Sequence, residues 1–420
     1  MTTLRTAAAA ALLAVTLAAC SALPTTAPAP AATTATPPVL LVSLDGFRPD
    51  YLELGITPNL NRLAAGGVRA EWMNASYPTL TFPNHYTVVT GLRPDRHGII
   101  DNTIRDPELG EFSLGNREAV SDGRWWGGEP IWVGAENAGL PTATMFWPGS
   151  EAEIRGVRPT RWLPFDESLP INARVDMVLG WLGEPAATRP RFATLYFEHL
   201  DKASHAHSFD SPEALASVAE LDRAIGRLLD GLAGRGPVNL VIVSDHGMAA
   251  VKPGSSVALE DMVAPSDAQA ITYGQAVGFA PLPGRTAAAE KSLLGAHEHY
   301  ECWRKQAMPA RWHFGSHPRV PPIVCQMHEG WTARPQATLT RRPATTTRGA
   351  HGFAPEAESM RSLFIAHGPA FVPKTTLPAF DNVDVYPLLA RLIGIQPAAN
   401  DGDIGPLIPA LKEKPQATGR

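Results

Sequence analysis

The clearest pattern along the chain consists of three short apolar runs, at residues 39–44, 192–197 and 240–244. Each run is continuous rather than alternating, which is typical of a strand that is buried on both faces of a sheet. Acidic residues follow each run within a few positions. The pattern therefore predicts three central strands whose carboxyl ends carry polar side chains.

Helical patterns lie between these runs. Thr57 and Pro58 precede one of them, which predicts a helix that Thr57 caps and the following glycine pair ends. From about Pro212 onward, apolar residues recur every three or four positions, which predicts a longer helix with one apolar face. This face comprises Leu215, Val218, Leu221, Ile225, Leu228 and Leu229.

Strands and helices thus alternate along the chain. This order predicts an α/β fold with a mostly parallel central sheet that is sandwiched by helices. In such sheets, ligands bind beyond the carboxyl ends of the strands. The polar residues after the three runs are therefore the first place to search for a functional site.

The first 20 residues carry the pattern of an export signal. Arg5 precedes an apolar stretch that is too short to span a bilayer comfortably, and small residues lead to Cys20. This segment resembles the bacterial lipoprotein signal, which implies that Cys20 is lipidated; Ser21 favours the outer membrane. The alternative is an ordinary cleaved signal. Residues 21–38 are rich in Ala, Pro and Thr and are expected to form an extended tether.

Two cysteines remain once Cys20 is assigned to the lipid. An exported protein folds in a compartment that permits disulfides, so we expect Cys302 and Cys325 to be bonded to each other. Two buried free thiols are the alternative.

Composition narrows the choice of partners. The 420 residues include 36 basic and 41 acidic side chains, a net charge of -5, so the chain as a whole lacks the cationic surface that duplex nucleic acid requires. With 44% apolar residues, the chain can bury a large core. After the signal, no stretch of the sequence is apolar enough to predict a membrane span.

Residues of metal-binding type stand at or near the predicted strand ends. They are Asp45, Asp201, His205, Asp245, His246 and His351. A catalytic zinc ion typically takes three protein ligands and keeps one position open, so three carboxylates and three imidazoles suit two metal ions. Each residue alone also fits a structural role in a turn. Their joint placement favours the two-metal site.

A hydroxyl residue, Thr79 or Thr81, stands at the start of a predicted Pro-opened helix. A helix start offers free N–H groups and partial positive charge, which favour both a phosphate and an alkoxide. Coordination to a metal can remove the threonine proton and produce a strong nucleophile. The alternative is that these threonines only cap the helix.

Several motifs together resemble the nucleotide pyrophosphatase/phosphodiesterase family of the alkaline phosphatase superfamily. Asp201 and His205 belong to this set, and all motifs fall in family order over roughly the whole mature chain. The other motifs are residues 42–46, 78–86, 98–102, 146–151, 244–248 and 349–353.

The resemblance implies a role for each site residue. Thr81 would be the nucleophile that forms a covalent phospho-threonine, and Asn102 would donate to a phosphoryl oxygen. Two Zn²⁺ ions are expected per chain. One would be held by Asp45, Asp245 and His246 beside the Thr81 oxygen, and the other by Asp201, His205 and His351.

Two phenylalanines are candidates for substrate binding. Phe82 follows the nucleophile and, by the same resemblance, would stack on a nucleotide base; Phe165 would close the opposite side of the base. Both could equally be core residues.

Residues 281–335 interrupt the alternation of strands and helices, so we expect them to form a cap inserted into a catalytic domain of residues 39–420.

These observations lead to one expected function and several alternatives. We expect an envelope protein, tethered to a membrane by its lipid, that hydrolyses nucleoside 5'-phosphodiester and pyrophosphate bonds and releases a nucleoside monophosphate. A phosphomonoesterase or a lipid-headgroup (glycerophosphocholine-type) phosphodiesterase could use the same metal pair. A non-catalytic binding lipoprotein is the alternative of another class.

Overall fold

The computed structural model describes residues 36–342 and 344–413. The expected signal peptide, Cys20 and almost all of the expected tether lie outside these residues. Within the described part of the chain, no helix is long and apolar enough to cross a membrane.

An eight-stranded sheet forms the centre of the fold, and β1 (Val39–Leu44) lies in its middle. β1 pairs in parallel with β8 (Phe192–Phe197) and with β9 (Asn239–Val243), as the three apolar runs predict. The strand order is β20-β2-β19-β9-β1-β8-β6-β7. The other strands are β2 (Val68–Ala70), β6 (Thr142–Met145), β7 (Arg161–Trp162), β19 (Phe364–His367) and β20 (Thr375–Leu377).

One strand of the sheet runs against the others. β19 pairs antiparallel with both β9 and β2, while the remaining pairs are parallel. The predicted α/β class is confirmed, and the sheet itself is mixed.

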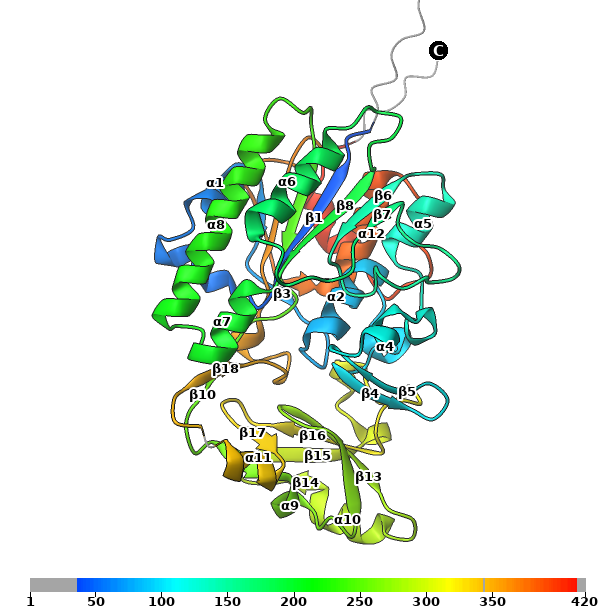
Figure 1. Ribbon diagram of the computed structural model, residues 1–420, viewed down its shortest axis with the longest axis vertical. Coiled ribbons are helices and arrows are strands. Elements are labelled where there is room, and N and C mark those ends of the chain that lie inside the picture. The colour runs from blue at the N-terminus through cyan, green and yellow to red at the C-terminus, as the bar shows by residue number, and fades with distance from the viewer. Residues whose placement is uncertain (1–35, 343, 414–420) are drawn as a thin grey trace, which may run out of the picture. The chain divides into compact units, whose positions relative to one another are not determined.

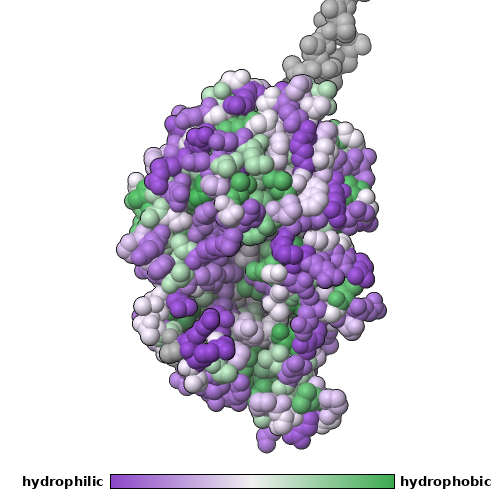
Figure 2. Space-filling view, in the orientation of Figure 1, coloured by the Kyte–Doolittle hydropathy of each residue, from purple (hydrophilic) through white to green (hydrophobic). Residues whose placement is uncertain are grey.

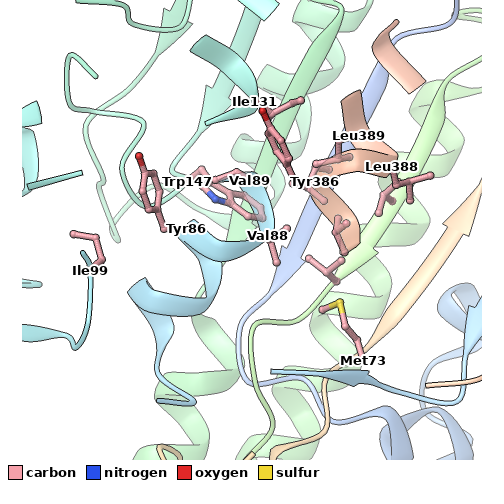
Figure 3. Close-up of a cluster of buried hydrophobic side chains, with 14 of the residues drawn as sticks. Met73, Tyr86, Val88, Val89, Ile99, Ile131, Trp147, Tyr386, Leu388 and Leu389 are labelled. Carbon is pink, nitrogen blue, oxygen red and sulfur yellow. The ribbon is translucent and has the colours of Figure 1, made fainter. Parts of the chain in front are cut away.

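Helices cover both faces of the sheet (Figure 1). On one face lie α1 (Pro58–Gly66), α6 (Ile171–Leu182) and α8 (Pro212–Leu232), and on the other α2 (Thr81–Thr90), α5 (Ile131–Asn137) and α12 (Val385–Ile393). Successive side chains of β1 point to opposite faces, so Leu41 joins one core and Leu40 the other. Figure 3 shows Val88 and Val89 of α2 beside Leu389 of α12.

The two predicted helices are present, but the start of one of them is stabilised by a different residue from the one predicted. The apolar face of α8 is buried at Val218, Leu221, Ile225 and Leu228. At α1, the Thr57 side chain makes no capping hydrogen bond, so that prediction was wrong. The carboxylate of Asp222 in α8 accepts from the backbone N–H groups at the start of α1 instead.

A second, five-stranded sheet lies apart from the first and has its own hydrophobic core. Its order is β12 (Ala268–Thr272), β13 (Ala276–Pro281), β16 (Ile323–Met327), β15 (Tyr300–Arg304) and β14 (Gly295–Ala296). It begins at Ala268, before the boundary at residue 281 expected from the sequence. β15 and β16 place Cys302 opposite Cys325, and a disulfide joins them.

The remaining elements are short. The helices are α3 (Pro94–His97), α4 (Arg117–Ser121), α7 (His199–His207), α9 (Leu259–Met262), α10 (Thr286–Leu293) and α11 (Gln336–Arg341). The strands pair as β10 (Ala249–Val251) with β18 (Arg348–Ala350), β11 (Ser256–Ala258) with β17 (Thr332–Arg334), β4 (Thr103–Asp106) with β5 (Gly110–Ser113), and β3 (Met73–Asn74) with β21 (Phe380–Asp381).

Candidate metal-dependent active site

Two buried carboxylates lie together because β1 and β9 are neighbouring parallel strands. Asp45 directly follows β1, and Asp245 lies just beyond the end of β9; both are 1% exposed. The backbone N–H of Gly46 donates to Asp245 Oδ1 over 3.2 Å, which fixes one carboxylate against the other strand end.

A third carboxylate joins them from the next strand. α7 begins two residues after β8 and carries Asp201 and His205 one helical turn apart, so both side chains lie on one face. Asp201 Oδ1 lies 3.5 Å from His205 Nε2 and 3.6 Å from His351 Nε2, which comes from the loop after β18. We call Asp201, His205 and His351 the α7 trio.

Three imidazoles of the site are oriented in the same way. His205 Nδ1 lies 2.9 Å from the carbonyl oxygen of Gly349, His351 Nδ1 lies 3.0 Å from that of Thr79, and His246 Nδ1 lies 2.9 Å from that of Gly247. A carbonyl oxygen only accepts, so each Nδ1 carries the proton and each Nε2 is left as a free ligand atom. This arrangement is typical of histidines that bind a metal.

One oxygen of each carboxylate accepts no hydrogen bond from the described residues. These buried atoms are Asp45 Oδ1, Asp201 Oδ1 and Asp245 Oδ2. Burying a charged oxygen without a partner is costly. The site therefore fits cations that would neutralise these oxygens.

The protonation behaviour of the two buried carboxyls supports the same conclusion. Burial, and after it the charges of Asp245 and Asp201, raises the pKa of Asp45 well above its ordinary value. Burial acts in the same direction on Asp245, but the imidazoles of His246 and His85 outweigh it and hold that pKa well below the usual range. Asp45 therefore needs added positive charge nearby before it ionises.

The ligand atoms form three overlapping groups, and within each group all atoms lie within 4.8 Å of one another. One group is the α7 trio, which the sequence analysis expected as a set. The other expected set is divided: His246 lies 2.9 Å from Asp245 Oδ2 and 3.7 Å from Asp45 Oδ1, but no single group contains all three. The other groups are Asp45 with Asp201 and His246, and Asp45 with His85 and Asp245.

Thr81 is the first residue of α2, and its Oγ1 lies 3.3 Å from His246 Nε2. The preceding Leu80 is the N-cap residue and makes no side-chain capping bond, so neither threonine caps this helix. Thr79 Oγ1 instead donates to the carbonyl oxygen of Phe353 and is fully buried. Thr81 is therefore the hydroxyl residue that faces the metal ligands.

Comparison with known proteins decides the family. The family model described as type I phosphodiesterase / nucleotide pyrophosphatase matches residues 39–354. The chain belongs to this family. Family members are metal-dependent, in agreement with the metal-ligand groups described above.

Curated relatives of the chain include Naja atra venom phosphodiesterase, which is 36% identical over 394 residues. The match covers 89% of this chain and 46% of the relative. Mus musculus ectonucleotide pyrophosphatase/phosphodiesterase family member 3 is 35% identical over 390 residues, covering 90% and 44%. The chain thus spans about half the length of these relatives.

Among solved structures, the chain is similar to murine ectonucleotide pyrophosphatase/phosphodiesterase 5, in an inactive threonine-to-alanine variant in complex with AMP. The TM-score is 0.84 at 31% identity, covering 90% of this chain and 100% of that one.

Asn102 and Phe82 lie next to Thr81. Asn102 Oδ1 accepts from the backbone N–H of Phe82 over 3.0 Å. Because Oδ1 accepts this bond, Nδ2 points away from the Phe82 N–H group. Nδ2 makes no hydrogen bond with the described residues. Asn102 therefore keeps a free donor beside Thr81.

The two predicted base-stacking residues lie in separate clusters. Phe82 is half-buried beside Phe112 and Trp126, while Phe165 is half-buried beside Phe146 and Tyr196. They belong to the cores on opposite faces of the sheet, so each contributes partly to the core and keeps part of its ring exposed.

Sequence reasoning missed two residues that contact the site. His85 Nδ1 lies 2.8 Å from the carbonyl oxygen of Thr81 and 3.3 Å from Asp245 Oδ2, and Tyr196 Oη donates to Asp45 Oδ2 over 2.6 Å. His85 follows Thr81 by one helical turn, so the spacing alone indicates that both side chains lie on the same face of the helix. Tyr196 lies inside an apolar strand, where a buried hydroxyl requires a partner.

Proposed function

We propose that this phosphodiesterase hydrolyses nucleoside 5'-phosphodiester and pyrophosphate bonds and releases a nucleoside monophosphate. The observation that carries the proposal is the position of Thr81: its hydroxyl stands at the start of α2, 3.3 Å from His246, among three carboxylates with unpaired oxygens. The start of a helix favours both a phosphate and an alkoxide, because its N–H groups are free and its dipole is positive there.

Two Zn²⁺ ions are the proposed cofactors, one held by Asp45, Asp245 and His246 and one by the α7 trio. When bound, they would supply Lewis-acid charge for the phosphoryl oxygens and lower the pKa of a coordinated hydroxyl.

Each residue of the site then has its own role in the proposed reaction. Thr81 Oγ1 attacks phosphorus and the bond to the leaving oxygen breaks, giving a phospho-threonine; the hydroxyl proton passes to water. The free Nδ2 of Asn102 donates to a non-bridging oxygen and holds the phosphoryl group in place. Attack by water on phosphorus then breaks the bond to Thr81 and restores the hydroxyl. Phe82 and Phe165, both half-buried, are the proposed contacts of the nucleotide base.

Two features of relatives support a nucleotide substrate. The murine neighbour was solved with AMP, and its threonine-to-alanine variant is inactive. The venom relatives are phosphodiesterases by name.

A hydrolysis panel on zinc-loaded protein tests the proposal. The panel contains the p-nitrophenyl ester of AMP, bis-p-nitrophenyl phosphate, p-nitrophenyl phosphate and p-nitrophenylphosphocholine. We expect the AMP ester to have the highest kcat/KM, and Thr81→Ala to lose activity by a factor of at least about 10³. Thr81→Ser retains a hydroxyl and should retain part of the activity.

The other outcomes of the panel are also decisive. Faster turnover of the monoester or the choline ester would replace the proposed substrate class. Zinc binding without turnover of any ester would favour a binding protein. Mass spectrometry of acid-quenched enzyme should show a phosphate on Thr81, and its absence under turnover would contradict the covalent route.

We also propose that the protein is lipid-anchored in the cell envelope, with the outer membrane favoured. The support is the sequence around Cys20 alone. Labelling with a radioactive fatty acid should mark the wild-type chain and not Cys20→Ala, and membrane fractionation would locate it.

A further inference from the structure

The inference rests on the proposed function and concerns Asn102, the residue proposed to donate to a phosphoryl oxygen. The amide of Asn102 is held at its oxygen, because Oδ1 accepts from the backbone N–H of Phe82, the second residue of α2. A donor stabilises a transition state only from the right position, and a displacement of about 1 Å can lower the rate by a factor of about 10². The position of the Asn102 backbone therefore matters as much as its side chain.

Asp101 holds this backbone. Its Oδ1 accepts from the backbone N–H of Thr103 over 2.9 Å, so the carboxyl spans Asn102 and closes a turn around it. Thr103 is the first residue of β4, which pairs with β5. Asn102 is thus fixed between the turn that Asp101 closes and the hydrogen bond to α2.

The carboxyl of Asp101 is buried, with only 9% of the residue exposed. Burial raises the pKa of Asp101 to about 7, although hydrogen bonds from the backbone N–H groups of Thr103 and Asn102 act in the opposite direction. No lysine or arginine among the described residues forms an ion pair with it. Burying a carboxyl without a cation is unfavourable, and such departures from the usual pattern are expected at functional sites.

The inserted region covers Asp101. Asp101 and Tyr77 line a cavity of about 20 Å³ together with Thr272 of the second sheet and Phe314 of the insertion. A cavity of this size is too small for bulk solvent. The Tyr77 ring also stacks on Trp312 of the insertion, with ring centroids 4.4 Å apart. On the face shown in Figure 2, the surface is hollowed between the region of α7 and the inserted sheet.

We propose that Asp101 is a positioning residue for the reaction: its carboxyl holds the backbone of Asn102 so that the free Nδ2 meets the phosphoryl oxygen. Asp101 acts through Asn102 and has no contact of its own with the substrate. The insertion contributes by keeping water away from the carboxyl, since water would compete for the N–H of Thr103.

The test begins with Asp101→Ala and Asp101→Asn, assayed with the p-nitrophenyl ester of AMP. We expect Asp101→Ala to lower kcat about tenfold and to change KM less than about twofold, because the donor acts mainly in the transition state. Asp101→Asn keeps an Oδ1 acceptor in the turn and should retain at least about half of the wild-type kcat.

A double-mutant cycle shows whether Asp101 acts through Asn102. Asn102→Ala alone should lower kcat about 10²-fold. Adding Asp101→Ala to that variant should lower kcat less than about twofold further, because the group that Asp101 positions is already absent. A further tenfold loss in the Asn102→Ala background, or an unchanged kcat in Asp101→Ala alone, overturns the positioning role.

A matched control and a folding check accompany the cycle. Asp403 Oδ1 accepts from the backbone N–H of Gly405 over 2.8 Å, a turn of the same kind at an exposed position, so Asp403→Ala should leave kcat unchanged. Urea unfolding is measured for every variant. If Asp101→Ala does not fold, Asp101→Leu, which fills the space without an acceptor, takes its place with the same expected loss.

The outcomes separate this inference from the proposed function. If the wild-type enzyme turns over the ester and the cycle shows independent effects, the positioning role fails while the proposed function stands. If the wild-type enzyme turns over no ester, the proposed function fails and the role of Asp101 with it.

Discussion

At the scale of single residues, the site depends on partners that hold the ligands as much as on the ligands themselves. Tyr196 and His85 contact Asp45 and Asp245, and the backbone carbonyl groups fix three imidazoles. Such partners set the orientation and basicity of a metal ligand. The ligands could be predicted from the sequence because they follow apolar strands, whereas their partners come from several distant segments.

Tyr196→Phe tests this view. Removal of the hydroxyl deprives Asp45 Oδ2 of its 2.6 Å hydrogen bond, and we expect the affinity for zinc to fall about 10- to 100-fold. Competition with a chelator measures it. Tyr86→Phe is the matched control, because the buried hydroxyl of Tyr86 has no partner in the described part of the protein. Equal zinc affinity in both variants would contradict the role of Tyr196.

A buried histidine away from the metal ligands predicts a pH dependence of stability. Burial lowers the pKa of His97 to about 3, while the unfolded chain takes up this proton near pH 6.5. The unfolded state therefore binds the proton first as the pH falls, and stability is lost from about pH 6.5 downward.

The measurement is urea unfolding at pH 7 and 5.5 for the wild type and for His97→Gln. Between these pH values, the free energy of unfolding should fall about 1 kcal/mol more in the wild type than in the variant. Parallel pH profiles would show that His97 is not held neutral in the folded state.

At the scale of elements, periodicity predicted the elements that are long or wholly apolar and missed those defined by pairing. The elements that periodicity predicted include β1, β8, β9 and α8. β19 is different, because nothing in its sequence distinguishes a strand that runs antiparallel to β9 from one that runs parallel. The start of the second sheet at Ala268 was missed for a similar reason, since β12 is short and partly polar.

The start of α1 gives a prediction at this scale. Asp222 Oδ1 accepts from the backbone N–H of Leu60 over 2.8 Å, and its Oδ2 accepts from Asn59. Asp222→Ala leaves these donors unpaired, and we expect a loss of about 1–2 kcal/mol in the free energy of unfolding. Asp230→Ala, an exposed aspartate of the same helix, should cost less than about 0.5 kcal/mol.

At the scale of the whole molecule, the inserted second sheet is attached to the segment around residues 95–125 by partly buried polar contacts. Arg319 donates to Asp106 and to the carbonyl oxygens of Gly98 and Trp125. Asp95 accepts from the backbone N–H groups of residues 315–317. These contacts place the insertion beside the segment that carries Asn102.

Arg319→Leu tests this attachment. Loss of the guanidinium leaves Asp106 and two carbonyl groups without their partner, and we expect a loss of about 2–4 kcal/mol in urea unfolding. Hydrogen exchange should also become faster at residues 313–320. The control is Arg311→Leu, because that exposed arginine of the same segment pairs with Glu356 and should cost less than about 1 kcal/mol. Similar losses in both variants would refute a special role for Arg319.

The sequence by itself determined the α/β class, the central strands and the candidate metal ligands. It left Thr79 and Thr81 as candidate nucleophiles, and the family resemblance pointed to Thr81. It could do so because burial imposes a pattern on neighbouring residues, and because ligands in such sheets follow the strand ends. Tertiary structure alone decided that Thr79 is tied to Phe353 and that His85 and Tyr196 reach the carboxylates. These contacts join segments far apart in the chain, and no local pattern of hydrophobic and polar residues records such distances.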